Sequence, residues 1–290
     1  MASSSTPLRY PGGKQKIFSF IKEIIELNGL AGIEYAEPYA GGAGVAIELL
    51  LNNIVKKIYL NDTSIAIYSF WKTLVDAPEW LCKKILLASL TVDEWKKQRE
   101  IFKNHNNYST EEIGFSTLYL NRCNRSGILT GGLIGGLKQN GVWKMDARFS
   151  RKDLIQRIEA IANRKSDIYV SNDDAEIFIK YKIDPSKHKK FIYFDPPYLN
   201  KAEHLYLNHY DYNDHKRIAQ KIQNIKEAYW IVSYDFNEYI TDLYKDRKYF
   251  VYNIQYNALK AYIGKELFIF SDNLAIPRYS KIKCINEAIN

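Results

Sequence analysis

The chain has 290 residues, and its 41 lysines and arginines against 33 aspartates and glutamates give a formal charge of +8 at pH 7. Apolar residues make up 46% and charged residues 26%, which is ordinary globular usage and excludes a disordered or fibrous protein. No stretch approaches the roughly 18 consecutive apolar residues of a membrane span, and the first seven residues lack the apolar core of a signal peptide. The three cysteines are far apart and form no CxxC pair, which argues against a disulfide framework or a zinc site. We therefore expect a soluble intracellular protein, whose positive charge is compatible with a polyanionic partner.

Short β-rich runs alternate with helical patterns along the chain, which predicts an α/β protein with a mostly parallel sheet flanked by helices. In chain order, the expected strands are residues 33–39, 57–61, 167–171, 191–194 and 230–233. The expected helices between them are residues 43–51, 65–75, 175–182 and 214–227. The tail differs, because residues 249–256 and 266–270 are strand-like runs separated by a loop, which favours a closing antiparallel pair.

Residues 79–165 interrupt this alternation. Helical patterns occur there at residues 79–89, 92–103, 111–122 and 152–163, with no clear strand among them. A glycine-dense run from Gly127 to Gly141 lies inside this segment, and so many glycines argue against a rigid core element. We expect a mostly helical insertion in an α/β domain.

The sharpest motif is Asp195-Pro196-Pro197-Tyr198, which follows the apolar run 191–194 directly. Two prolines cannot donate ladder hydrogen bonds, so the strand must end there. A carboxylate, a carbonyl and an aromatic ring then lie at the carboxyl end of a buried strand, where open α/β sheets bind ligands. The carboxylate and the carbonyl make a double acceptor for an –NH₂ group, and the ring can stack on the base that carries it. The alternative is a proline turn with an incidental aspartate, which the position after such a strand disfavours.

A glycine-rich turn follows the first expected strand, with the sequence Glu37-Pro38-Tyr39-Ala40-Gly41-Gly42-Ala43-Gly44. Glycines let the backbone approach a ligand closely at a helix N-terminus, and the absence of GxGxxG argues against a pyrophosphate site. Asp62 ends the second strand, 20 residues after Gly42, where an acid can accept from both hydroxyls of a ribose. The turn alone is an ordinary strand-to-helix connection, but turn and acid together favour a nucleoside ligand.

Two further motifs are less specific. Residues 10–14, Tyr-Pro-Gly-Gly-Lys, expose backbone N–H groups and offer a cation to a carboxylate, although a solvated loop would look the same. Residues 121–127, Asn-Arg-Cys-Asn-Arg-Ser-Gly, suit hydrogen bonding to adenine, guanine and phosphate. They are also typical of a helix C-terminus with dipole-favoured arginines and a glycine cap, and both interpretations can hold at once.

Taken together and in this order, the motifs resemble those of the Dam-type (D12 class) DNA adenine-N6 methyltransferases. The matching runs are residues 10–14, 37–44, 60–62, 172–175, 195–198, 205–208, 230–234 and 264–267, which span nearly the whole chain. The resemblance implies a Rossmann-like methyltransferase fold that uses S-adenosyl-L-methionine, with a mostly parallel sheet and an antiparallel last strand. It implies a catalytic domain of residues 1–78 and 166–290 and a helical target-recognition insertion of residues 79–165.

The resemblance also implies roles for individual residues. It assigns catalysis to Asp195, Pro196, Pro197 and Tyr198. The cofactor-binding residues that it implies are Tyr10, Gly12, Gly13, Lys14, Glu37, Pro38, Tyr39, Ala40, Gly41, Gly42, Gly44, Asp62, Asp174 and Asp195. The candidate DNA-binding residues are Asn121, Arg122, Asn124 and Arg125, and no metal site is expected.

The implied reaction moves the methyl group of S-adenosylmethionine to N6 of an adenine that has left the DNA duplex. Hydrogen bonds from the –NH₂ group to Asp195 and the Pro196 carbonyl would draw the nitrogen toward sp³ geometry, without a covalent enzyme intermediate. Flipping the base costs about a few kcal/mol, part of which stacking on Tyr198 would recover.

The chain departs from the family in the insertion. GATC-specific members carry Asn-Arg-x-Gly-x-Asn-Gly, which residues 121–127 match only in their first pair, so GATC recognition is not implied. Two alternatives stay open: a methyltransferase for RNA adenine or cytosine N4, and a cofactor-binding but silent DNA-binding defence protein. The expected partner is double-stranded DNA, with a cognate restriction endonuclease as one option and no membrane. We expect a monomer in the cytoplasm of a bacterium, host-encoded or phage-encoded, and associated with the nucleoid when acting.

Overall fold

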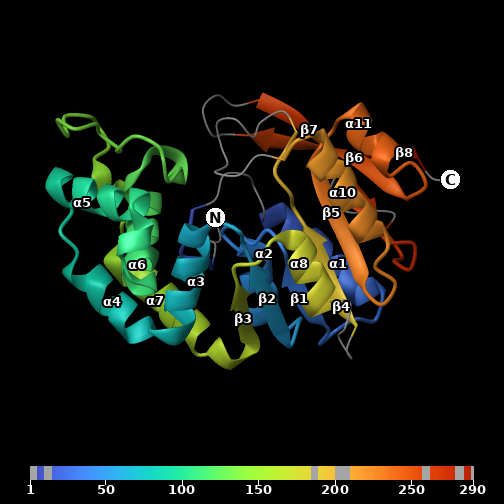
Figure 1. Ribbon diagram of the computed structural model, residues 1–290, viewed down its shortest axis with the longest axis horizontal. Coiled ribbons are helices and arrows are strands. Elements are labelled where there is room, and N and C mark those ends of the chain that lie inside the picture. The colour runs from blue at the N-terminus through green and yellow to red at the C-terminus, as the bar shows by residue number, and fades with distance from the viewer. Residues whose placement is uncertain are drawn as a thin grey trace. The chain divides into compact units, whose positions relative to one another are not determined.

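The computed structural model of the protein describes residues 5–9, 15–183, 189–199, 210–256, 262–277 and 284–288 (Figure 1). The chain divides into two compact units. The helical unit comprises Met1–Pro11 and Ser64–Val170, and the sheet unit comprises Gly12–Thr63 and Ser171–Asn290. Within the described ranges, no helix is long and apolar enough to cross a membrane.

The described residues form one mixed sheet of eight strands in the order β3-β2-β1-β4-β5-β7-β6-β8. The strands are β1 (Glu34–Glu37), β2 (Lys57–Asn61), β3 (Ile168–Ser171), β4 (Lys190–Phe194), β5 (Tyr229–Asp235), β6 (Tyr249–Tyr256), β7 (Tyr262–Phe270) and β8 (Cys284–Ala288). β1 is parallel to β2 and β4, and β4 is parallel to β5. β7 is antiparallel to β5 and β6, and β8 is antiparallel to β6. The predicted α/β fold with a mostly parallel sheet and a closing antiparallel pair is confirmed, and β8 adds a strand that the sequence analysis did not predict.

The sheet unit also contains α1 (Gln15–Leu27), α2 (Gly44–Leu51), α8 (Ala175–Phe178), α10 (Tyr212–Gln223) and α11 (Glu238–Leu243). The expected helix at 175–182 is α8 followed by one π-helical turn, Ile179–Ile183. All five residues of β4 are buried, as expected for a central parallel strand covered on both faces.

The side chains of β7 alternate between the two faces of the sheet and pack against different helices on each face. Phe268 and Phe270 pack with Phe20 of α1 at ring-centroid distances of 5.2 and 6.2 Å. Leu267 and Ile269 join the buried cluster that holds residues of α10 and α11, which Figure 1 shows beside β5. Successive side chains of a strand point to opposite faces, so one strand serves both cores.

The helical unit contains α3 (Ile65–Asp76), α4 (Pro78–Leu87), α5 (Val92–Lys103), α6 (Thr110–Cys123) and α7 (Arg151–Ala162). Short 3₁₀ turns lie at His105–Asn107, Arg125–Gly127, Met145–Arg148 and Lys165–Asp167. The four helices expected in 79–165 are confirmed, as α4 to α7. Every residue of α6 from Ile113 to Cys123 is buried. Its Gly114 lies against α3, where an added Cβ would come within 2.6 Å of the Ser69 carbonyl oxygen.

Candidate active site

Asp195 lies directly after β4 and is held by Ser233 of β5, which is itself hydrogen-bonded to Tyr193 of β4. The Ser233 hydroxyl donates to Asp195 Oδ1 at 2.8 Å, and the Tyr193 hydroxyl lies 2.8 Å from Ser233 Oγ. Burial, and then the Asp195 carboxylate, raise the pKa of Tyr193 far above its ordinary value. Tyr193 therefore stays protonated. Because the single hydroxyl proton of Ser233 goes to the Asp195 carboxylate, Tyr193 is the donor in its hydrogen bond with Ser233. The carboxylate is fixed in place while remaining partly exposed.

Tyr198 is held by a buried carboxylate of β7. Its hydroxyl donates to Glu266 Oε1 at 2.9 Å, and the Tyr252 hydroxyl donates to Glu266 Oε2. Glu266 and Tyr252 are direct cross-strand partners, and Glu266 is only 2% exposed. Burial, and then Glu266, raise the pKa of Tyr252, so this phenol also remains a donor. The sequence analysis quoted residues 264–267 as a matching run but gave Glu266 no role.

The glycine-rich turn between β1 and α2 is tied to β2 through Asp62. The backbone N–H of Gly41 donates to Asp62 Oδ2 at 2.9 Å, and Gly41 has a left-handed φ of 47°. Ala43, with φ 45°, has the same handedness although it carries a Cβ. Glu37 is buried, and its Oε1 accepts from the N–H of Ala46 and from the Tyr35 hydroxyl, both at 3.1 Å. A carboxylate at the first turn of α2 also complements the helix dipole.

Asn61 joins the ends of three strands, and the sequence analysis did not single it out. Its Nδ2 donates to the carbonyls of Pro38 at 3.0 Å and Asp173 at 2.9 Å. Its Oδ1 accepts from the Ser171 hydroxyl at 2.7 Å and the Asp173 N–H at 2.9 Å. Asn61 is fully buried, so its polar groups need these partners. The signal in the sequence is its position as the last residue of the strand-like run 57–61. Asp174, next in the chain, is exposed and caps α8 by accepting from the Glu176 N–H at 2.8 Å.

A polar aromatic cluster includes Tyr39 of the glycine-rich turn, the one member to which the sequence analysis gave a role. The Tyr39 hydroxyl lies 3.0 Å from that of Tyr210, whose ring packs edge-on against His215. His215 Nδ1 lies 3.1 Å from the Tyr234 hydroxyl at the end of β5. Burial lowers the pKa of His215, so the imidazole is neutral.

The structure thus brings together the candidate residues of the strand ends in the sheet unit. Residues Tyr10, Gly12, Gly13 and Lys14, and the matching run 205–208, lie outside the described residues. Asn121, Arg122, Asn124 and Arg125 belong to the helical unit, where the first three are buried and Arg125 is exposed. The buried three bind protein groups: Asn121 and Arg122 contact residues 7–9, and Asn124 Oδ1 accepts from Trp95 Nε1 at 2.7 Å.

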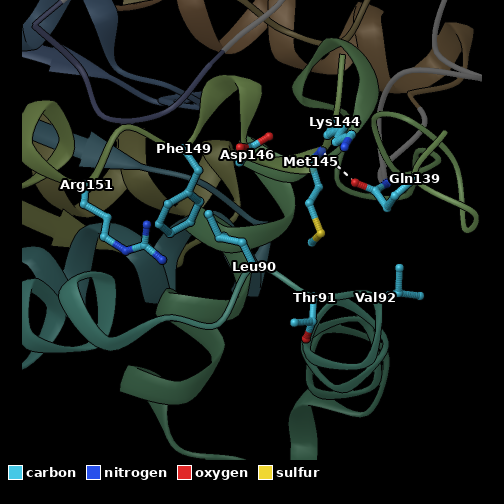
Figure 2. Close-up of a pocket in the computed structure, with 9 residues that line it drawn as sticks. All are labelled: Leu90, Thr91, Val92, Gln139, Lys144, Met145, Asp146, Phe149 and Arg151. Atoms are coloured by element: carbon cyan, nitrogen blue, oxygen red, sulfur yellow. Dashed lines mark hydrogen bonds between the residues drawn. The ribbon is translucent and has the colours of Figure 1, made fainter. Parts of the chain in front are cut away.

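The helical unit has a pocket of about 530 Å³ (Figure 2). Its lining residues are Leu90, Thr91, Val92, Gln139, Lys144, Met145, Asp146, Phe149 and Arg151. Gln139 holds the backbone of Met145 at one wall of the pocket, because its Oε1 accepts from the Met145 N–H at 3.0 Å. None of the candidate cofactor-binding residues that the structure describes lines this pocket.

The carboxylate acceptors of the sheet unit fit an adenosyl sulfonium compound. Asp62, Asp174 and Asp195 follow β2, β3 and β4. Their carboxylates can accept hydrogen bonds from ribose hydroxyls and from an adenine amine, and they attract the positive charge of a sulfonium or ammonium group. In the part of the chain that the structure describes, no group of His, Cys, Asp and Glu is arranged to hold a metal ion.

Comparison with known proteins decides the family. The family of D12 class N6 adenine-specific DNA methyltransferases matches residues 10–258, which is most of the chain. The protein belongs to this family. It is 26% identical over 227 residues to the type II methyltransferase M.MjaIII of Methanocaldococcus jannaschii, covering 73% of this chain and 76% of that protein.

Two solved structures of the rRNA methyltransferase AviRa of Streptomyces viridochromogenes are also similar, with identities of 9% and 8% and TM-scores of 0.39 and 0.34. They cover 94% and 91% of this chain and 94% and 87% of their own chains. These scores are too low to inform the substrate. The family membership identifies this D12 class protein as an enzyme that methylates adenine N6 in DNA, and a methyltransferase of this family uses S-adenosylmethionine as methyl donor.

Proposed function

We propose that this D12 class enzyme methylates N6 of a flipped-out adenine within a short recognition sequence of double-stranded DNA, with Asp195 and the Pro196 carbonyl as the groups that bind the reacting amine. The observation that carries the proposal is the hydrogen-bond chain from Tyr193 through Ser233 to Asp195. It supports a carboxylate whose position is set before the substrate arrives, which is the main requirement for catalysis by positioning.

The amine of adenine is a poor nucleophile because its lone pair is delocalised into the ring. Donating its two N–H groups to Asp195 and to the Pro196 carbonyl favours the pyramidal nitrogen, whose lone pair can attack the methyl group. Pro196 and Pro197 lack N–H groups, so no backbone donor of these two residues competes for the acceptors. S-adenosylmethionine supplies the electrophilic methyl group. As the N–C bond forms and the S–C bond breaks, the N6 proton becomes acidic and leaves to solvent, so Asp195 need not be a strong base.

Tyr198 is proposed to stack on the flipped adenine, with Glu266 holding its hydroxyl. For the cofactor we propose Asp62 as the partner of the ribose hydroxyls, Asp174 as the partner of the adenine, and Lys14 as the partner of the methionyl carboxylate. The remaining cofactor-binding residues of the glycine-rich turn keep the roles that the family resemblance implies.

The helical unit is proposed to read the target sequence, with exposed Arg125 as a DNA contact. The recognition sequence is proposed to differ from GATC, since residues 121–127 depart from the GATC-specific pattern. The proposed partner is the restriction endonuclease of a restriction–modification system, because methylation of the recognition sequence would protect DNA against it.

The test is methyl transfer by purified protein from S-[methyl-³H]adenosylmethionine to duplex DNA, single-stranded DNA and RNA, followed by nucleoside analysis. We expect label in N6-methyladenine from duplex DNA, and none with Asp195→Asn, which should still bind the cofactor. Label in N4-methylcytosine, or only in RNA, would contradict the proposal.

A further inference from the structure

Tyr210 is the residue immediately before α10 in the sheet unit, and the start of this helix is fixed by a reciprocal cap. Asp211 Oδ1 accepts from the Asp214 N–H at 2.8 Å, and Asp214 Oδ2 accepts from the Asp211 N–H at 2.9 Å. Such a capping box satisfies two backbone donors of the first turn and so defines how the chain enters the helix. The position of Tyr210 is therefore tied to that of α10.

The first turns of α10 and α8 lie side by side. Arg217 of α10 donates to Glu176 Oε1 of α8 at 2.7 Å, and the N–H of Glu176 donates to Asp174, the N-cap of α8, at 2.8 Å. The exposed ion pair contributes little free energy, but it shows that these turns are neighbours. Burial, and then the Asp174 carboxylate, raise the pKa of Tyr210 to about 12 against the lowering effect of its hydrogen bond with Tyr39.

The side chain of Tyr210 lies between the glycine-rich turn and α10. Its hydroxyl is 3.0 Å from the Tyr39 hydroxyl, and the two rings meet edge to face at 6.1 Å. On the α10 side its ring meets the fully buried ring of His215 at 5.5 Å. His215 is itself held through Nδ1, which lies 3.1 Å from the hydroxyl of Tyr234 in β5. Tyr210 thus connects the turn to a buried and fixed part of the sheet unit.

The glycine-rich turn has a backbone conformation that needs such support. Two residues after Tyr39, Gly41 donates its N–H to Asp62 Oδ2 at 2.9 Å. Gly41 and Ala43 have left-handed φ angles of 47° and 45°. This conformation is unfavourable for a residue with a Cβ, such as Ala43, and it persists only where surrounding contacts determine it.

We infer that Tyr210 is a positioning residue for S-adenosylmethionine: through the hydroxyl of Tyr39 it holds the glycine-rich turn in the conformation that receives the adenosine half of the cofactor. Tyr210 lies near both groups proposed for that half, the turn bonded to Asp62 and the Asp174 carboxylate. The inference rests on the proposed cofactor roles of these residues, and it adds a residue from outside the matching motifs.

The experiment is calorimetry on Tyr39→Phe, Tyr210→Phe and the double variant with two compounds. One is S-adenosylmethionine, and the other is methylthioadenosine, which keeps the adenosine and lacks the amino acid. We expect each single change to weaken binding of both compounds about fivefold, the effect of one hydrogen bond. The double variant should lose no more than either single variant, because the two changes remove the same bond.

Tyr212→Phe is the matched control. It removes a phenol from the start of the same helix, where the side chain is 59% exposed and packs on Tyr239, so both compounds should bind normally. In steady-state methyl transfer, Tyr210→Phe should raise KM for S-adenosylmethionine and leave kcat unchanged, which a general loosening of the fold would not do.

Normal affinity in Tyr210→Phe, additive losses in the double variant, or a loss for S-adenosylmethionine without one for methylthioadenosine would overturn the inference. If the unaltered protein bound neither compound, the proposed function would fail instead.

Discussion

Tyr198→Phe is the sharpest test of how the proposed base-stacking residue is held. The substitution removes the 2.9 Å hydrogen bond from the phenol to Glu266 and keeps the ring. A buried hydrogen bond to a charged group contributes about 1.5–3 kcal/mol, so we expect the free energy of unfolding to fall by about 2 kcal/mol. If the bond also sets the ring angle, kcat should fall about tenfold, which corresponds to about 1.4 kcal/mol in the barrier.

Tyr252→Phe is the matched control, because it removes the other phenol from the same carboxylate and leaves the Tyr198 bond in place. The two variants should lose similar stability in urea unfolding, but only Tyr198→Phe should lose kcat in single-turnover methyl transfer, with unchanged cofactor affinity. Full activity in Tyr198→Phe, or an equal loss of kcat in Tyr252→Phe, would refute the positioning role of Glu266.

Three further predictions concern the sheet unit. Ser233→Ala should lower kcat about tenfold or more without changing cofactor affinity, since it frees Asp195 from its 2.8 Å donor; single-turnover rates unchanged from the unaltered protein would show that the serine only packs. Burial lowers the pKa of His215 in the folded state, so the free energy of unfolding should fall as the pH drops below about 6.5, the unfolded value, by at most about 1.4 kcal/mol per pH unit. Urea unfolding of the His215→Gln variant at several pH values should lack this contribution. The same pH dependence in the variant and in the unaltered protein would contradict the prediction. Phe268→Ala, which empties the contact with Phe20, should cost about 3–5 kcal/mol of unfolding free energy, and a loss below about 1 kcal/mol would show that the cluster re-packs.

Most strands and helices of the sheet unit could be predicted in their chain order, because the spacing of apolar residues and the composition of each run indicate which residues are buried. The predicted strand 191–194 is a continuous apolar run that is followed by Asp195 and two prolines, so its end follows from the residues themselves, while the observed β4 starts one residue earlier, at Lys190. β8 was missed because its five residues, Cys-Ile-Asn-Glu-Ala, show neither a continuous apolar run nor a clear alternation, and its pairing with β6 is a tertiary contact. α1 was overlooked although its apolar residues recur at helical spacing, a signal that was present in the sequence.

The candidate site was predictable as a set of motifs but not as a network. Asp195 and Tyr198 could be found in the chain, whereas Ser233 and Glu266 become partners only once β5 and β7 pair in their observed register. Asn121 and Arg122 show the opposite limit: their residue types suit DNA, but burial in α6 directs their hydrogen bonds to residues 7–9. Which partner a polar side chain meets depends on long-range packing that local pattern does not encode.

The central claim is tested most directly by modification-aware sequencing of DNA from a methylation-free host that expresses this protein, with Asp195→Ala expressed in parallel. The account predicts N6-methyladenine in a single short sequence motif with the unaltered protein and none with the variant. Unmodified DNA in the presence of folded protein that binds S-adenosylmethionine would contradict it.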